Sequence, residues 1–264
     1  MFLLRPWQYY DRIAESYDDY YETSPQGRLY HRILETLLEE TIEDIRTLGV
    51  TVEIGGGTGT WTHLFSARSS RVIFVEPSLK MLEIAKEKNR TLENVEYLHT
   101  SLESLTQSIP AITADTIIVL GDVLSYVDDV TKAMDILSQI SKSGTVLIGS
   151  VDGYYRGLKE IIFAGAFDAI KTLERFRKIQ VGNPDLTEES LISRVFKPSD
   201  LTELLESKGF VLEKIAGIEV FGPYEDRHLS RYMNEILDVE LKYSRDPNIL
   251  GMAEHLFFFA RRRW

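Results

Sequence analysis

The sequence contains no cysteine. Disulfide bonds, zinc–thiolate sites, iron–sulfur clusters and cysteine nucleophiles are therefore excluded. Long hydrophobic runs are also missing: stretches such as "TIIVLGDVL" at 116–124 fall well short of the roughly 20 residues of a membrane span. The apolar start "MFLL" is too short for the core of a signal peptide. We therefore expect a cytoplasmic protein without a membrane span.

Positive charge is comparatively scarce. Lys and Arg number 30 against 41 Asp and Glu, which gives a formal net charge of −11. This balance disfavours nucleic acid as a partner, because nucleic-acid binding needs a basic surface. The five histidines and the carboxylates show no metal-ligand spacing, so we expect no required metal.

What is present is an ordinary globular composition over 264 residues, with a regular alternation of elements in the middle of the chain. The first 48 residues have helical periodicity. Beyond them, short apolar runs predict strands at 50–54, 71–76, 94–99, 114–121 and 145–151, with helices at 58–67, 78–89 and 128–141 between them. This alternation predicts an α/β fold, a Rossmann-like doubly wound sheet that is mostly parallel.

The alternation stops after residue 152. A helical stretch at about 154–175 and a polar β-hairpin at about 177–196 are expected to form an insert above the sheet. A helix at 198–208, a strand after Gly209, a helix at 230–243 and an antiparallel C-terminal strand, "EHLFFFA", follow. The expected organisation is an N-terminal helical cap (1–48), a core (49–151), an insert (152–197) that forms a lid with the N-terminal helices, and a segment that completes the sheet (198–264).

The stretch "VEIGGGTGTWT", residues 52–62, is the strongest local signal. Gly55, Gly57 and Gly59 can adopt positive φ and leave no Cβ between the backbone and a ligand. The spacing is not that of the dinucleotide fingerprint G-x-G-x-x-G, because Thr60 and Thr62 stand where the third glycine would be needed. The stretch also lacks the Gly-Lys-Ser/Thr ending of a P-loop. Taken alone, the stretch is either a cofactor loop or a plain turn between a strand and a helix.

Glu76 supplies a second signal. It closes the next strand, 17 positions beyond Gly59. In a doubly wound sheet an acid at this place can accept hydrogen bonds from both hydroxyls of an adenosine ribose, although a solvated carboxylate is the simpler alternative. The two signals support each other because their positions agree.

These residues carry a resemblance to a family. "EIGGGTG", followed by "VEPS", "SLESL" and "LGDVLSYVDD", resembles the class I S-adenosylmethionine-dependent methyltransferases, and within them the small-molecule enzymes related to ubiquinone and menaquinone biosynthesis. The resemblance is strong over 50–151, extends to "YYDRIAESYDDYYE" at 9–22, and is loose after 152. It implies S-adenosylmethionine as cofactor and S-adenosylhomocysteine as product.

The resemblance also implies roles for individual residues. Those implied to bind the cofactor are Glu53, Gly55, Gly57, Gly59, Glu76, Pro77, Met81, Ser101, Leu102, Glu103, Leu120, Gly121 and Asp122. Glu53 would orient the ammonium group, Glu76 would take the ribose hydroxyls, and Asp122 would lie beside the sulfonium. Ser101 stands where the family often has an aspartate for the adenine amino group, so a backbone carbonyl or Glu103 would replace that contact.

Tyrosines are the expected residues of the acceptor side. Five crowd the first helix (Tyr9, Tyr10, Tyr17, Tyr20 and Tyr21), and Tyr154 and Tyr155 open the insert. They either form a lid over the acceptor, with Tyr17, Tyr126 and Tyr154 as the lid residues that we name, or pack against the sheet. No catalytic residue is certain; the candidates are Asp122, Tyr17 and His31. His31 is either a general base or a surface residue, and we expect His255 to be packed in the last strand.

We therefore expect methyl transfer to a small-molecule acceptor, such as a quinone precursor, by direct in-line displacement. The first alternative is a methyltransferase acting on RNA or protein, which the acidic charge and "LGDVL" in place of an Asn/Asp-Pro-Pro-Tyr signature disfavour for RNA. The second is a cofactor-binding protein without transferase activity, and a nicotinamide dehydrogenase is the weakest. We expect a monomer or a homodimer.

Overall fold

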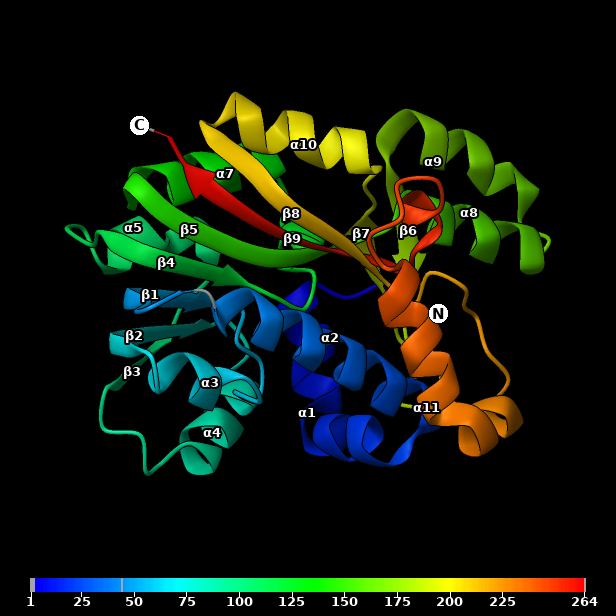
Figure 1. The fold of residues 1–264 in the computed structure, drawn as a ribbon, viewed down its shortest axis with the longest axis horizontal. Coiled ribbons are helices and arrows are strands. Elements are labelled where there is room, and N and C mark those ends of the chain that lie inside the picture. Colours follow the sequence, from blue (N-terminus) through cyan, green and yellow to red (C-terminus); the bar gives the residue numbers. More distant parts are fainter. Residues whose placement is uncertain (1–2, 44, 264) are drawn as a thin grey trace.

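A seven-stranded sheet forms the centre of the computed structural model, which describes residues 3–43 and 45–263 (Figure 1). The strand order is β3-β2-β1-β4-β5-β9-β8. The strands are β1 (Gly49–Ile54), β2 (Ser69–Glu76), β3 (Val95–His99), β4 (Ala114–Val119), β5 (Ser141–Asp152), β8 (Phe210–Ile218) and β9 (His255–Arg262). The first five are parallel, and β9 runs antiparallel to both β5 and β8. The expectation of a mostly parallel, Rossmann-like sheet with an antiparallel C-terminal strand is confirmed.

Helices cover both faces of this sheet. On the lower face in Figure 1 lie α1 (Pro6–Thr23), α2 (Pro25–Glu43), α3 (Thr62–Ser66), α4 (Leu79–Lys88) and α11 (Asp226–Tyr243). On the upper face lie α5 (Leu105–Ser108), α7 (Val130–Gln139) and α10 (Pro198–Ser207). Among the described residues no helix combines the length and the apolar character needed to cross a bilayer.

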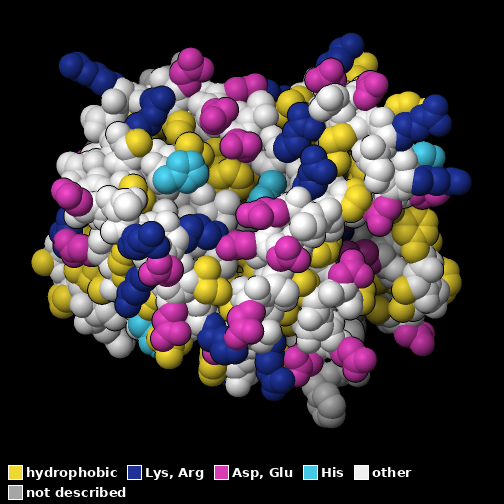
Figure 2. All heavy atoms as spheres, turned by 90° about the horizontal axis from the view of Figure 1, so that it is seen from below, with side chains coloured by type: hydrophobic (Ala, Val, Ile, Leu, Met, Phe, Trp, Pro, Cys, Tyr) yellow, Lys and Arg dark blue, Asp and Glu magenta, His cyan; other side chains and the backbone are white. Residues whose placement is uncertain are grey.

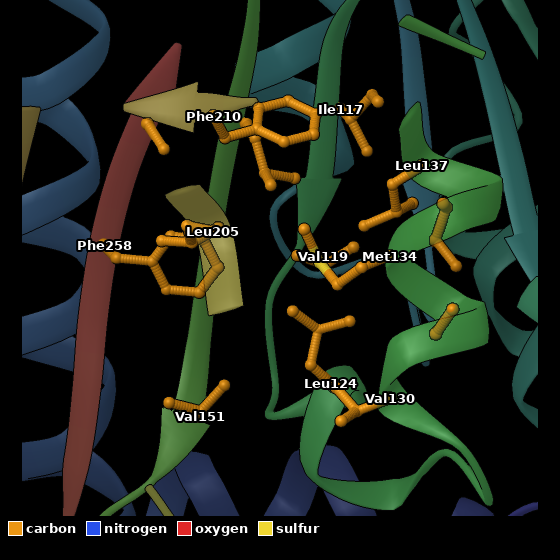
Figure 3. Packing of buried hydrophobic residues seen from close by; sticks show 14 of the residues in the cluster. Ile117, Val119, Leu124, Val130, Met134, Leu137, Val151, Leu205, Phe210 and Phe258 are labelled. Carbon is orange, nitrogen blue, oxygen red and sulfur yellow. The ribbon is translucent and has the colours of Figure 1, made fainter. Parts of the chain in front are cut away.

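Two hydrophobic cores fill the spaces between the sheet and these helices, because side chains alternate along a strand. In β4, Ile117 and Val119 face the upper core, and Ile118 faces the lower one. Figure 3 shows the upper core, where Met134 and Leu137 of α7 lie against these β4 side chains. The lower core takes the apolar face of α2 and the aromatic rings on the opposite side of β9.

The region after β5 has a small core of its own. It comprises α8 (Tyr154–Phe163), α9 (Ile170–Phe176) and a two-stranded antiparallel sheet of β6 (Lys178–Val181) and β7 (Leu191–Arg194). Tyr154 is buried there with Leu173 and Ile179. The hairpin that the sequence indicates is confirmed, and its loop approaches α1, where the backbone N–H of Asn183 donates to the hydroxyl of Tyr9 at 2.9 Å.

Several boundaries differ from the expectation: α3 begins at Thr62 instead of 58, α11 begins at Asp226 instead of 230, and the helical stretch expected at 154–175 is divided into α8 and α9. The helix expected at 128–141 ends at Gln139, and β5 begins at Ser141 instead of 145. Ala114 of β4 pairs with Ser141, and a bulge then shifts the register. Gly144, with φ at 87°, lies at this irregularity, so it serves the strand and not the helix end.

Candidate active site

A large cleft opens at the carboxyl ends of β1, β2 and β4. Its volume is about 630 Å³, and its lining comes from α1, α2, the glycine loop and the segments that follow β2, β3 and β4. Eleven of the residues that the resemblance assigns to the cofactor line it: Glu53, Gly55, Gly57, Glu76, Pro77, Met81, Ser101, Leu102, Glu103, Leu120 and Gly121. In parallel α/β sheets the ligand site lies at this edge.

The glycine loop has the backbone conformation that the sequence indicates. Gly55 and Gly57 have φ values of 66° and 59°. A Cβ added at Gly55 would lie 2.4 Å from a methyl carbon of Val123, so this glycine is required by packing. A Cβ at Gly57 would meet no protein atom within 4 Å, so at this position the loop backbone faces open space in the cleft.

Glu76 holds this loop in place. Its Oε2 accepts a hydrogen bond from the backbone N–H of Gly57 at 2.9 Å, and its Oε1 accepts one from that of Ser78 at 2.8 Å. Burial raises the pKa of Glu76 to about 7, against the effect of the two hydrogen bonds. The carboxyl therefore fixes the loop and also lines the cleft, a positioning role that the sequence does not indicate.

Glu53 is a buried carboxyl group at the wall of the cleft. It is only 3% exposed, and its Oε2 has no hydrogen-bond partner among the described residues. Burial, and in addition the nearby charge of Glu76, raise the pKa of Glu53 to about 8. A buried carboxyl oxygen without a partner costs free energy, and an ammonium group in the cleft would satisfy it.

Helix α1 lies across the cleft and is bonded to the glycine loop and to the start of α4. Asp18 accepts a hydrogen bond from Thr58 Oγ1 at 2.6 Å and forms an ion pair with Lys88 Nζ at 2.6 Å. Asp11 accepts hydrogen bonds from the hydroxyl of Ser78 and from the backbone N–H of Lys80. The glycine loop and the start of α4 are thereby tied to α1.

A second, smaller cavity adjoins the cleft. Its volume is about 210 Å³, and it is enclosed by α1, α2, the β6–β7 loop and the residues around His255. Five residues line both spaces: Tyr10, Tyr17, Tyr30, Gly121 and Tyr126. We call the shared region the neck; within it the ring of Tyr10 contacts those of Tyr17 and Tyr126, with centroids 6.2 Å and 6.0 Å apart.

A cluster of charges lies at one side of the second cavity. His255 Nδ1 lies 2.8 Å from Asp122 Oδ2 and 3.4 Å from Asp152 Oδ1. Burial lowers the pKa of His255, but the carboxylates, Asp122 first, outweigh burial and raise it to about 9. Asp152 also accepts hydrogen bonds from Arg156 and from the hydroxyl of Ser193. Burial raises the pKa of Asp152, whereas Asp122 and His255 form an ion pair that holds Asp122 in place.

Backbone geometry also distinguishes Asp122. It has φ at 62°, a left-handed conformation that non-glycine residues seldom adopt. Its backbone N–H donates to the hydroxyl of Ser150 at 3.1 Å. Asp122 lines the second cavity and not the cleft, although the resemblance assigns it to the cofactor.

The remaining predicted residues have different fates. Tyr17 and Tyr126 lie at the neck, and their lid role stays a prediction; Tyr154 lines neither space because it is 6% exposed in the core of α8 and α9. Gly59 does not line the cleft either: its carbonyl accepts from Asn89 Nδ2 at 2.9 Å, and a Cβ there would lie 2.5 Å from that nitrogen. Gly59 permits close packing on α4.

His31 lines the cleft and stacks on Tyr21, with ring centroids 4.3 Å apart. Burial lowers the pKa of His31 to about 4. Its ring is therefore neutral at pH 7 and a weak base, which disfavours His31 as the general base.

Sequence reasoning missed four residues of the second cavity and its cluster: Asp152, Arg156, Glu219 and His255, the last expected only to be packed. A signal for two of them exists. Asp152 ends β5 and His255 begins the antiparallel β9, so both must lie at the sheet edge where Asp122 follows β4. The spacing along the chain hides this, because the residues lie on three separate segments.

Asp122, Asp152 and His255 also form a group whose possible ligand atoms lie within 4.8 Å of one another. Such a group could hold a divalent ion. Arg156 pairs with Asp152 at this point, and a second cation would be repelled by it. The expectation that no metal is required therefore stays a prediction, which chelation can test.

Acidic and basic side chains are interspersed on the face seen in Figure 2, which carries no broad basic patch among its described residues. This distribution agrees with the negative net charge.

Known proteins resemble this chain in part of its sequence and in its fold. Residues 25–215 match the family model of the methyltransferase domain. An uncharacterized methyltransferase of Alkaliphilus oremlandii is 34% identical over 92 residues, which cover 34% of this chain and 43% of that protein. The match thus spans less than half of that relative.

Two solved structures show the same fold over nearly their whole length. The complex of DhpI with SAH has a TM-score of 0.62 at 18% identity and covers 97% of this chain and 94% of DhpI. The N-methyltransferase NodS of Bradyrhizobium japonicum, in complex with S-adenosyl-L-homocysteine, has a TM-score of 0.62 at 14% identity and covers 99% and 100%. Because the family model matches well over half of the sequence, this chain belongs to the methyltransferase domain family.

Proposed function

We propose that this protein transfers a methyl group from S-adenosylmethionine, bound in the cleft, to a small molecule bound in the second cavity. The observation that carries the proposal is the neck, where Gly121 and four tyrosines line both spaces. Two ligands in these spaces would meet there, which is what a direct transfer between them requires.

The residues of the cleft fit the cofactor. The unpartnered oxygen of Glu53 suits its ammonium group, and the open space at Gly57 admits a ligand against the backbone. Glu76 would take the ribose hydroxyls while it holds the loop, and Met81 and Leu102 supply apolar surface for the adenine. Ser101 and Glu103 lie at the same end of the cleft, so either can serve the adenine amino group.

S-adenosylmethionine supplies, when bound, a methyl carbon on a positively charged sulfur. The protein's own contribution is then alignment and exclusion of water. Tyr10, Tyr17 and Tyr126 enclose the neck, and the ties of Asp11 and Asp18 hold α1 over it. Transfer therefore needs no covalent nucleophile from this chain.

The small size of the second cavity favours a small acceptor over a macromolecule. A volume of about 210 Å³ is smaller than that of common drug-sized pockets, which hold ~300–1,000 Å³. NodS, which shares the fold, is named an N-methyltransferase. The quinone-precursor acceptor that the sequence resemblance implies remains a second candidate, because the tyrosine rings of the neck suit a planar ring.

The test is incubation with trideuteromethyl S-adenosylmethionine and separate pools of small metabolites, total RNA and unfolded protein. We expect formation of S-adenosylhomocysteine and deuterium label only with the small-molecule pool. Label in RNA or protein would contradict the proposed acceptor class. Cofactor binding without turnover in any pool would favour the alternative of a binding protein without transferase activity.

A further inference from the structure

The second cavity contains two buried carboxyl oxygens that have no hydrogen-bond partner within residues 3–43 and 45–263, the part of the chain that the structure describes. They are Asp122 Oδ1 and Glu219 Oε1, and both residues line this space. Asp122 is 3% exposed, so water does not solvate its side chain freely. Buried polar atoms are satisfied in the great majority of cases, and the two exceptions here indicate that a ligand completes them.

The cations of the same cavity are already engaged. Arg156 contacts Asp152, Glu160 at 3.0 Å and Glu254 at 3.2 Å. His255 is in ion-pair contact with Asp122, with its Nδ1 2.8 Å from Asp122 Oδ2. An incoming anion would therefore compete with carboxylates for each of these cations. The cavity presents free acceptors and no free cation among its described residues.

Tyrosine is the most frequent residue type in the remaining lining. Tyr9, Tyr10, Tyr17, Tyr20, Tyr21, Tyr30 and Tyr126 contribute to it. Burial raises the pKa of Tyr17 and Tyr30 well above the usual value, so they remain neutral phenols. Tyrosine ring faces attract a cation, and hydroxyl oxygens accept hydrogen bonds from it.

We propose that the acceptor is a small amine, held as its ammonium form by Asp122 Oδ1 and Glu219 Oε1 among these tyrosines, and that its nitrogen is the methylated atom. The proposal rests on the proposed function and names the substrate class of that site. A carboxylate or phosphate would face uncompensated like charge, and a neutral hydroxyl would satisfy only one of the two oxygens by donating its single proton.

The reaction balances with the groups present. The ammonium first loses one proton to the carboxylate of Glu219, which gives the nitrogen a lone pair. That pair forms the bond to the methyl carbon, the carbon–sulfur bond breaks, and its electron pair stays on sulfur. Burial raises the pKa of Glu219 to about 7, which makes it a stronger base than an exposed carboxylate. The proton leaves from Glu219 to solvent when the products depart.

The test measures binding and does not depend on turnover. The protein is saturated with S-adenosylhomocysteine and titrated calorimetrically with three skeletons, ethyl, benzyl and phenethyl, each as amine, alcohol and carboxylate. A catechol is included as a quinol-type probe. We expect at least one amine to bind about tenfold or more tightly than the alcohol of the same skeleton, which is the worth of a charge-assisted hydrogen bond. The carboxylates should not bind.

Two variants localise the effect. Glu219→Gln keeps the shape of the side chain, and we expect it to weaken amine binding about tenfold while the affinity for S-adenosylhomocysteine stays unchanged. Glu213→Gln is the matched control: this carboxylate lies on β8, the strand that Glu219 directly follows, pairs with Arg261 and lines neither space. Amine binding in the control should equal that of the unaltered protein.

The outcomes separate the two proposals. Failure of S-adenosylhomocysteine to bind overturns the proposed function itself. If it binds, and no amine binds more tightly than its alcohol, or a carboxylate or the catechol binds best, the amine proposal is wrong and the proposed function stands. Equal amine binding by Glu219→Gln and Glu213→Gln would also overturn it.

Discussion

The cleft and the second cavity are neighbours, but the chain builds them in opposite ways. The cleft is largely encoded by short contiguous motifs: residues 53–59 form its loop, and Glu76 and Pro77 follow the next strand. The second cavity is assembled from residues far apart in sequence, such as Tyr17, Asp122 and His255. Local sequence motifs therefore indicate the cleft, where we propose that the cofactor binds. The residues of the second cavity, where we propose that the acceptor binds, come together only in the folded chain.

Their electrostatics also differ. In the cleft, Glu53 and Glu76 are buried carboxyls whose pKa values burial raises to about 8 and about 7. Beside the second cavity, ion pairing outweighs burial for Asp122, whose pKa is lowered by His255. The buried acids of the cleft thus have no paired cation among the described residues, whereas the second cavity combines the ion pair of Asp122 and His255 with Glu219, whose pKa burial raises to about 7.

The largest effect is expected at the loop. Gly57→Val places a branched side chain in the open space of the cleft, so we expect no measurable binding of S-adenosylmethionine while the protein stays folded. Gly144→Val is the control, because Gly144 also has positive φ and open space but lies at the far end of the sheet. Circular dichroism and calorimetric titration check both. Normal binding by Gly57→Val would show that the loop is only a turn.

Asp122→Asn breaks the ion pair of the second cavity. Loss of one partner of a buried pair costs about 3–5 kcal/mol of folding free energy. Because the folded-state pKa of His255 is raised from 6.5 to about 9, the stability gained from its protonation is complete below pH 6.5 and is lost as the pH rises through about 9.

We therefore expect the difference in unfolding free energy between the unaltered protein and Asp122→Asn to shrink above that pH, in urea titrations at several pH values. The NMR titration of His255 should show a lower pKa in the variant. A difference that is independent of pH would contradict the ion pair.

Glu76→Ala should weaken the affinity for S-adenosylmethionine by about 1.5–3 kcal/mol, through loss of the charge-assisted bonds to the ribose. The loop also loses the acceptor for the N–H of Gly57. Calorimetry measures the change, and Glu96→Ala, an exposed carboxylate on the adjacent β3, serves as control. An unchanged dissociation constant would remove Glu76 from the site.

Tyr17→Ala should have the smallest effect and should distinguish the two spaces. Loss of an aromatic contact costs about 0.5–1.5 kcal/mol. Since Tyr17 lines the neck, we expect the KM of the acceptor to rise more than the dissociation constant of the cofactor. Steady-state kinetics and calorimetry give the two values. An equal rise in the KM of the acceptor and in the dissociation constant of the cofactor would argue against a lid role for Tyr17.

The sequence allowed the sheet, its antiparallel last strand and most of the cleft to be predicted, since strand periodicity and the glycine loop are local properties. Tyr154 and His255 show the limit. An aromatic residue at the start of the insert can face a ligand or a local core, and Tyr154 packs against Leu173 and Ile179. His255 looked like a packed strand residue because its partners, Asp122 and Asp152, lie more than 100 positions away.

The most direct test of the central claim is a parallel calorimetric titration with S-adenosylmethionine, S-adenosylhomocysteine and NAD. We predict saturable binding of the first two with one site per chain and no signal with NAD. Absence of binding for both sulfur compounds, or preferential binding of NAD, would contradict the assignment of the cleft and the proposed methyl transfer.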